Sequence, residues 1–371
     1  MTWSSTGSWF NGISFAFLLA VVSVSCLGCG EPTSGGGSGT GSGVDEGDGE
    51  LAQLEGKIEI DGSSTVYPIS EAAAEQFKKL MPKVKVTVAV SGTGGGFKRF
   101  AKGETDISDA SRPIKGAGEE SEFAECKKNQ VAFIELPVAY DGLSIVINPE
   151  NDFVEQLTVE DLKKIFLEEG GAKTWKDVNE NWPDTVIKIY APGTDSGTFD
   201  YFFGDVVAKD KENEHPRSDM SVSEDDNNLV TGVAGEKGAI GFFGAAYYFE
   251  NEDKIKAVAI VDPNTDKPVM VTPKTIESGE YAPFSRPLFI YVNVDSLKRP
   301  EMKKFVEFYL DNGKSLAETA KYVGLPQEIY DVARMHYEDR LTGTHFLTPE
   351  MEKRVGPLAE LYKAEDLVDT E

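Results

Sequence analysis

Four short segments place small hydroxyl residues and glycines directly after an expected strand and before an expected helix. They are residues 61–65 (DGSST), 91–96 (SGTGGG), 108–112 (SDASR) and 194–198 (TDSGT). A helix amino terminus offers unpaired backbone N–H groups, a glycine turn lets an anion approach the backbone, and hydroxyl groups add donors. Each turn alone is an ordinary helix cap. Together the four predict a site for a small oxyanion that is held by many neutral donors.

The elements that would position these turns follow from the hydrophobic pattern. Short β-like runs alternate with helix-like runs, which is typical of layered α/β proteins. The strand-like runs are residues 57–62, 84–90, 131–140, 143–148, 186–191, 238–244, 256–261 and 287–293. The helix-like runs are residues 68–80, 95–103, 158–166, 195–207, 300–309, 314–323 and 326–337.

Five stretches of the chain resemble one known family. They are DGSSTVYPI (61–69), SGTGGGFKRFAKGETDISDASRPIK (91–115), DGLSIVIN (141–148), APGTDSGTFDYF (191–202) and GAIGFFG (238–244). The sequence resembles the phosphate-binding component of the high-affinity phosphate ABC transporter, the PstS family of type II periplasmic binding proteins. The resemblance extends over about residues 56–340.

This resemblance implies a two-lobed α/β fold, in which each lobe is a mixed sheet flanked by helices. Residues 56–144 and 292–371 would form the first lobe, and residues 145–291 the second. The chain would cross between the lobes near 141–148 and 287–293, which would form a two-segment hinge. One dehydrated phosphate would be held in the cleft and delivered to the permease of an ABC transporter.

The resemblance also implies a role for each candidate residue of the site. Hydroxyl or backbone donors would come from both lobes: Ser64, Thr65, Ser91, Thr93, Ser196, Gly197 and Thr198. Asp109 would accept the proton of the phosphate, and Arg112 would be the cationic partner. Better-known members carry an arginine shortly before the Ser-Gly-Thr turn, whereas residues 191–194 here read APGT. We therefore expect Arg112 to supply the charge.

A carboxylate inside an anion site has a physical use. Phosphate near neutral pH carries a proton that Asp109 can accept, whereas sulfate carries none. A buried polar group that is left without a partner costs about 1–3 kcal/mol, and more if it is charged. Asp109 would therefore favour phosphate by penalising sulfate.

The amino-terminal part predicts an extracytoplasmic protein. Residues 13–25 form an apolar run of signal-peptide length, too short to span a membrane, and residues 1–28 read as a signal peptide. The small residues around Cys29 resemble a bacterial lipobox, so we expect a lipid anchor there; the alternative is an ordinary cleaved signal with Cys29 unmodified. Residues 29–55 are rich in Gly, Ser and acidic residues, as in a flexible tether.

The amino-acid composition limits the kinds of partner and ligand that the protein can bind. With 37 Lys+Arg against 63 Asp+Glu, the formal net charge is −26, which excludes an ordinary nucleic-acid binder. The three cysteines cannot form a disulfide framework, and three histidines leave little material for a metal site. We expect a monomer without cofactor or metal, whose ligand is inorganic phosphate.

Two alternatives remain open. The ligand could be another tetrahedral oxyanion, such as sulfate or molybdate. A different class is a hydrolase that uses Asp195 or Ser196, but an aspartic protease needs a second carboxylate and a serine hydrolase needs a base. Neither partner is evident, so we expect no enzymatic activity.

Overall fold

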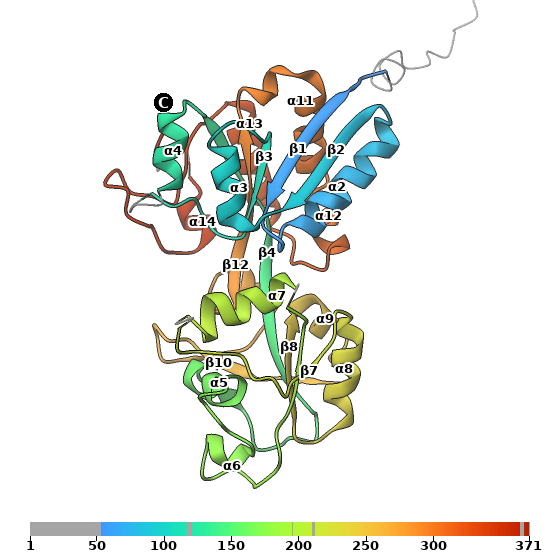
Figure 1. Ribbon diagram of the computed structural model, residues 1–371, viewed down its shortest axis with the longest axis vertical. Coiled ribbons are helices and arrows are strands. Elements are labelled where there is room, and N and C mark those ends of the chain that lie inside the picture. The colour runs from blue at the N-terminus through green and yellow to red at the C-terminus, as the bar shows by residue number, and fades with distance from the viewer. Residues whose placement is uncertain (1–52, 117–120, 195, 210–211, 364–366, 371) are drawn as a thin grey trace, which may run out of the picture. The chain divides into compact units, whose positions relative to one another are not determined.

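The computed structural model describes residues 53–116, 121–194, 196–209, 212–363 and 367–370 (Figure 1). The predicted signal peptide, Cys29 and all but the end of the predicted tether lie outside these residues. In the described part of the chain, no helix has the length and apolar character that a membrane crossing requires.

The first half of the main sheet brings three strand ends together. β1 (Gly56–Gly62) pairs in parallel with β2 (Val84–Val90) on one side and with β3 (Ile107–Ala110) on the other. Because parallel strands end at the same edge, the turns after all three lie side by side. β1 and β2 each lead into a helix, α2 (Tyr67–Leu80) and α3 (Gly92–Phe100).

Two long strands join the lobes. β4 (Phe133–Ile147) is buried along its whole length. Its residues Phe133–Gly142 pair antiparallel with β12 (Ser285–Asn293), and Leu143–Ile147 then pair with β8 (Ala239–Gly244). Figure 1 shows β4 and β12 passing from one group of elements to the other.

The boundaries that we drew at 144/145 and 291/292 remain a prediction, and strand pairing divides the chain at slightly different places. The lower part of β4 begins to pair with β8 at Leu143. Residues Phe289–Val292 of β12 pair with β3, so this part of the strand belongs to the sheet of the first lobe.

The second lobe completes the main sheet and adds a small one. The main sheet continues from β4 through β8, β6 (Lys188–Ala191) and β7 (Ser221–Val222), with β9 (Lys256–Ala257) also paired to β4. The small sheet contains β11 (Pro268–Val269), β10 (Ala259–Val261) and β5 (Gln156–Leu157). The helices of this part are α5 (Val159–Phe166), α6 (Trp175–Val178), α7 (Gly197–Phe199), α8 (Asp226–Gly235), α9 (Ala245–Phe249) and α10 (Pro273–Glu277).

The helix predicted over 195–207 is present in two parts. α7 is followed without a break by a π-helical segment, η1 (Asp200–Val207). Its aromatic residues anchor it in the core, since the ring of Phe202 stacks on Phe242 of β8 with centroids 3.9 Å apart. This packing fixes the face of η1 that carries Tyr201 and Asp205.

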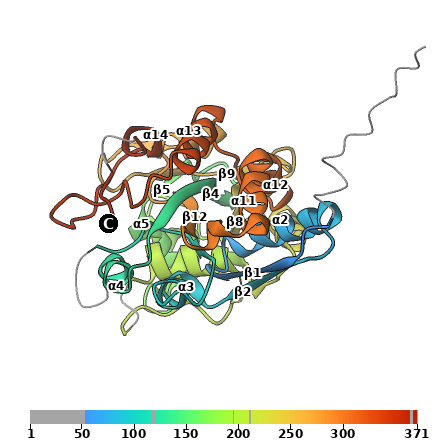
Figure 2. The same cartoon turned by 90° about the horizontal axis from the view of Figure 1, so that it is seen from above.

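The remaining helices surround the first lobe. They are α4 (Glu122–Lys128), η2 (Ser296–Lys298), α11 (Pro300–Asp311), α12 (Gly313–Thr319), α13 (Gln327–Glu338) and α14 (Leu358–Leu361). Figure 2 shows α13 and α14 together on one side of β4. The segment after α13 is tied to β4, because Thr344 and Tyr362 donate hydrogen bonds to the carboxylate and the carbonyl of the buried Glu135.

Candidate functional site

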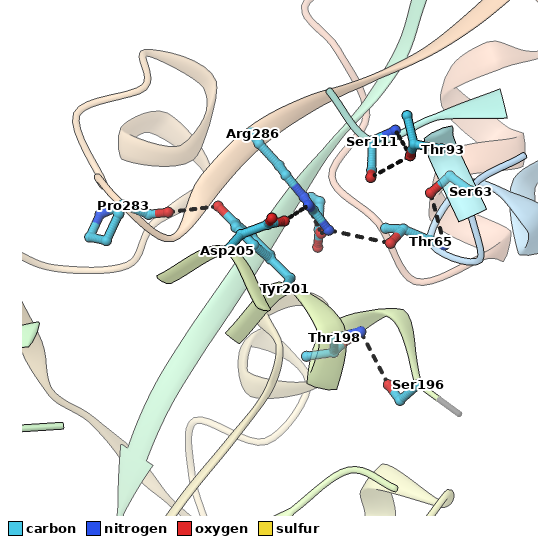
Figure 3. Close-up of polar contacts among 11 residues, drawn as sticks. Ser63, Thr65, Thr93, Ser111, Ser196, Thr198, Tyr201, Asp205, Pro283 and Arg286 are labelled. Atoms are coloured by element: carbon cyan, nitrogen blue, oxygen red, sulfur yellow. Dashed lines mark hydrogen bonds and ion pairs between the residues drawn. The ribbon is translucent and has the colours of Figure 1, made fainter. Parts of the chain in front are cut away.

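The predicted donor turns of the first lobe meet at the edge where β1, β2 and β3 end (Figure 3). The Oγ of Ser63 accepts a hydrogen bond of 3.2 Å from the backbone N–H of Thr65. The hydroxyl of Thr93 lies 3.0 Å from that of Ser111 and accepts the backbone N–H of Ser111. The second and third turns are thereby linked to each other.

The two helices that start at this edge carry no side-chain cap. The residue before α2 is Val66, and the residue before α3 is Ser91, whose side chain makes no cap hydrogen bond. At α2, the N–H groups of Tyr67 and Ile69 donate to the backbone carbonyls of Ser63 and Val66, and Pro68 has no N–H. At α3, the first N–H groups have no backbone acceptor among the described residues, so this helix end is the one open to an anion, with the helix dipole in support. Ser64 and Ser91 stand at these ends and are partly or fully exposed.

The second lobe contributes one turn, residues 196–198, at the start of α7. The Oγ of Ser196 accepts the backbone N–H of Thr198 at 3.2 Å. Gly197 lies directly on the first-lobe turn: a Cβ built on it would be 2.7 Å from the Oγ1 of Thr65 and 2.9 Å from its Cα. Only glycine permits this approach, so the predicted donors of both lobes are brought together.

Asp109 is completely buried at the end of β3. Its Oδ1 accepts a hydrogen bond of 2.9 Å from the hydroxyl of Ser70, and its Oδ2 has no partner among the described residues. Burial raises the pKa of Asp109 to about 8; the Ser70 hydrogen bond opposes this shift and the charge of Asp61 adds to it. The carboxyl group is therefore poised to hold or release a proton near neutral pH.

Arg112 is engaged with a carboxylate of its own lobe. Its two terminal nitrogens donate to the two oxygens of Glu122 at 2.8 and 2.7 Å, and it also donates to the carbonyl of Pro113. A bidentate pair of this kind uses the planar donor edge that would otherwise face an anion. The structure thus places Arg112 beside the site, with its charge already matched.

A second arginine, Arg286 at the start of β12, was not predicted from the sequence. Its guanidinium donates to the Oγ1 of Thr65 at 3.3 Å and to Asp205 at 2.7 Å, as Figure 3 shows. It also contacts the buried Asp141 at 3.1 Å. The available signal was a charged residue next to the predicted crossing at 287–293, but only the donor turns and the residues before the Ser-Gly-Thr turn were considered as sources of a cation.

A cavity of about 560 Å³ opens next to these groups. Ser111, Arg112, Tyr201, Asp205 and Arg286 line one side of it. Residues 353–358 of the C-terminal segment line another, so this segment, for which the sequence suggested no role, forms part of the approach to the site.

Of the two residues named for the hydrolase alternative, Ser196 is described, and its hydroxyl accepts the backbone N–H of Thr198. Asp195 lies outside the described residues. His215 pairs with Glu169 through its Nδ1 at 2.7 Å, and His336 stacks on His345 with ring centroids 4.7 Å apart. Burial, reinforced by His345, lowers the pKa of His336 to about 4.

Comparison with known proteins decides the family. Residues 34–312 match the model of a PBP superfamily domain. The chain is 42% identical to the phosphate-binding protein PstS of Staphylococcus haemolyticus over 279 residues, which cover 75% of this chain and 84% of that one. The chain belongs to the PstS family of periplasmic binding proteins. The resemblance noted in the sequence and the two-lobed type II fold are thereby confirmed.

Other relatives support the same family assignment. Protein SphX of Synechococcus elongatus is 44% identical over 320 residues, or 86% of this chain and 91% of that one. Among solved structures, a possible phosphate binding protein from Planctomyces limnophilus shares 47% identity with a TM-score of 0.73, over 78% of this chain and all of that one. An ABC-type phosphate transport receptor from Vibrio cholerae shares 26% identity with a TM-score of 0.55, over 72% of this chain and all of that one.

Proposed function

We propose that this protein captures inorganic phosphate between its two lobes, outside the cytoplasm, and delivers it to the permease of an ABC transporter. The observation that carries the proposal is the contact of Gly197 with Thr65, which joins donor turns from both lobes beside the open amino end of α3. The relatives named for phosphate binding and phosphate transport support the choice of ligand.

The proposed ligand suits the donors. Backbone N–H groups, hydroxyl groups and one guanidinium neutralise a small anion at short range, so a net charge of −26 is no obstacle to binding. When Asp109 is ionised it accepts a hydrogen bond from protonated phosphate and repels sulfate. Sulfate and molybdate would therefore be poor competitors.

We also propose the other properties that the sequence led us to expect. The protein acts as a binding protein rather than an enzyme, works as a monomer, and needs neither cofactor nor metal, with phosphate as its cargo. A lipid on Cys29 would hold it at a membrane surface, and its acidic character would keep it from binding nucleic acid.

Calorimetric titration tests the proposal. The mature protein is first freed of any co-purified ligand by partial unfolding and dialysis, then titrated with phosphate, sulfate and molybdate at pH 8. We expect saturable 1:1 heat with phosphate and at least tenfold weaker binding of the other two anions. Absence of heat with phosphate in correctly refolded protein would contradict the proposal.

A further inference from the structure

Arg286 occupies the junction of the two lobes. It stands at the start of β12, one of the two connecting strands, and its Nη2 lies 3.3 Å from the hydroxyl of Thr65 in the first lobe. Its Nη1 donates to Asp205 of η1 in the second lobe at 2.7 Å. A single guanidinium therefore bridges a donor turn of one lobe and a helix of the other.

The side chain is held firmly in this position. It is 14% exposed, and its guanidinium carbon lies 3.7 Å from the ring centroid of Tyr201. The Oδ2 of Asp141 accepts a hydrogen bond of 3.1 Å from Nε and forms an ion pair with Nη2 at 3.1 Å, and the Asp141 side chain is only 2% exposed. These contacts fix the plane of the guanidinium with no contribution from Asp205.

Two carboxylates share this one cation, and they differ in exposure. Asp141 is buried, whereas the side chain of Asp205 is 61% exposed and lines the cavity next to the site. An exposed carboxylate gives up an ion pair at little cost, because water solvates it well. A buried one does not. Asp205 is therefore the partner that an incoming anion can displace or compete with.

We infer that Arg286, rather than Arg112, is the cation that contacts phosphate in this chain, and that Asp205 competes with phosphate for its charge. This inference rests on the proposed function. Arg112 is committed to Glu122, while Arg286 is already adjacent to Thr65. Asp205 thus determines affinity without belonging to a donor turn.

Calorimetry on single variants of the full mature chain tests the inference. Arg286→Gln is expected to weaken phosphate binding at least about 100-fold, because a desolvated charge pair is lost. Arg286→Lys keeps the charge but loses the planar fork, so an intermediate loss is expected. Asp205→Asn keeps an oxygen that can accept from Nη1 but removes the negative charge, and it should tighten phosphate binding about fivefold.

The chain offers a matched control pair. Arg334 and Asp311 form an ion pair remote from the site, and Asp311 is 62% exposed, close to the value for Asp205. Arg334→Gln and Asp311→Asn should leave phosphate affinity unchanged. Thermal melts accompany every variant, so that loss of folding is recognised; Arg286→Lys then carries the test if Arg286→Gln does not fold.

The possible outcomes separate a failure of the proposed function from a failure of the assignment of the cation. If the wild type binds no phosphate, the proposed function fails. If the wild type binds phosphate and both Arg286 variants bind it equally well, or if Arg112→Gln alone abolishes binding, only the assignment of the cation is overturned. Weaker binding by Asp205→Asn would overturn the competition and make Asp205 a supporting residue.

Discussion

The two lobes contribute to the site in different ways. The first lobe presents three turns on one sheet edge, linked by the contacts of Thr93 with Ser111, and two helix ends without side-chain caps. The second lobe presents one turn, in which Ser196 already accepts the N–H of Thr198. We therefore expect the first lobe to receive the anion and the second lobe to close on it and exclude water.

A substitution at Gly197, where the second lobe contacts the first, should have the largest effect on phosphate binding. In Gly197→Ala, the added methyl carbon would lie 2.7 Å from the Oγ1 of Thr65, so the lobes could not close fully. We expect phosphate binding to weaken at least about 100-fold, as several hydrogen bonds to a charged ligand would be lost together. Calorimetry measures the change.

Gly235→Ala is the matched control, since a Cβ at Gly235 would have no neighbour within 4 Å. It should bind phosphate like the wild type. Unchanged affinity in Gly197→Ala would contradict the distinction between a receptor lobe and a closing lobe.

Selectivity should depend on the first lobe alone. Asp109→Asn removes the ionisable group, so the preference for phosphate over sulfate should fall about 30-fold at pH 9, where wild-type Asp109 is ionised. At pH 6 the wild-type carboxyl group is protonated and its discrimination should be smaller. A preference that is the same in both proteins at both pH values would exclude Asp109 from selectivity.

The link between the second and third turns should have a moderate effect. Thr93→Ala removes one hydroxyl group and frees the N–H of Ser111, so phosphate affinity should fall about tenfold. Thr231→Ala is the control, because the hydroxyl of Thr231 bonds only to Asn227 within α8. Equal affinities in the two variants would show that the turns act independently.

Asp109 should also affect stability without ligand. The pKa of Asp109 is raised from 3.8 to about 8 in the folded chain, so its contribution to stability is full below pH 3.8 and is lost as the pH rises towards 8. Urea unfolding should show wild type losing on the order of 4 kcal/mol more than Asp109→Asn between pH 5 and 8, since each pH unit in this range costs about 1.4 kcal/mol. Parallel pH profiles would contradict the buried, protonated state.

Much of the first lobe could be predicted from the sequence, because its signals are local. The alternation in residues 84–90 gives β2, and hydroxyl residues after a strand mark each donor turn. The start of α3 at Gly92 was not predicted, since four glycines in five residues disfavour a helix by about 1 kcal/mol each. Tertiary packing outweighs this: a Cβ at Gly96 would lie 2.6 Å from the Cα of Gly62.

The position of Arg286 beside a donor turn could not be predicted, because it depends on non-local strand pairing. Arg286 is distant in sequence from the donor turns, and only the pairing of β12 with β4 and β3 brings it to Thr65. Arg112 follows a donor turn directly, which made it the natural candidate, but α4 places Glu122 against it. Sequence proximity to a binding turn therefore pointed to Arg112, whereas the fold adds Arg286 as a second candidate.

Hydrogen–deuterium exchange with and without phosphate tests most directly whether both lobes hold one anion. The account predicts slower exchange at backbone N–H groups of residues 63–67 and 91–94 in the first lobe and of residues 196–198 in the second, reached at the same phosphate concentration. Protection in neither region, or protection that is confined to the first lobe at saturating phosphate, would contradict capture of phosphate between the lobes.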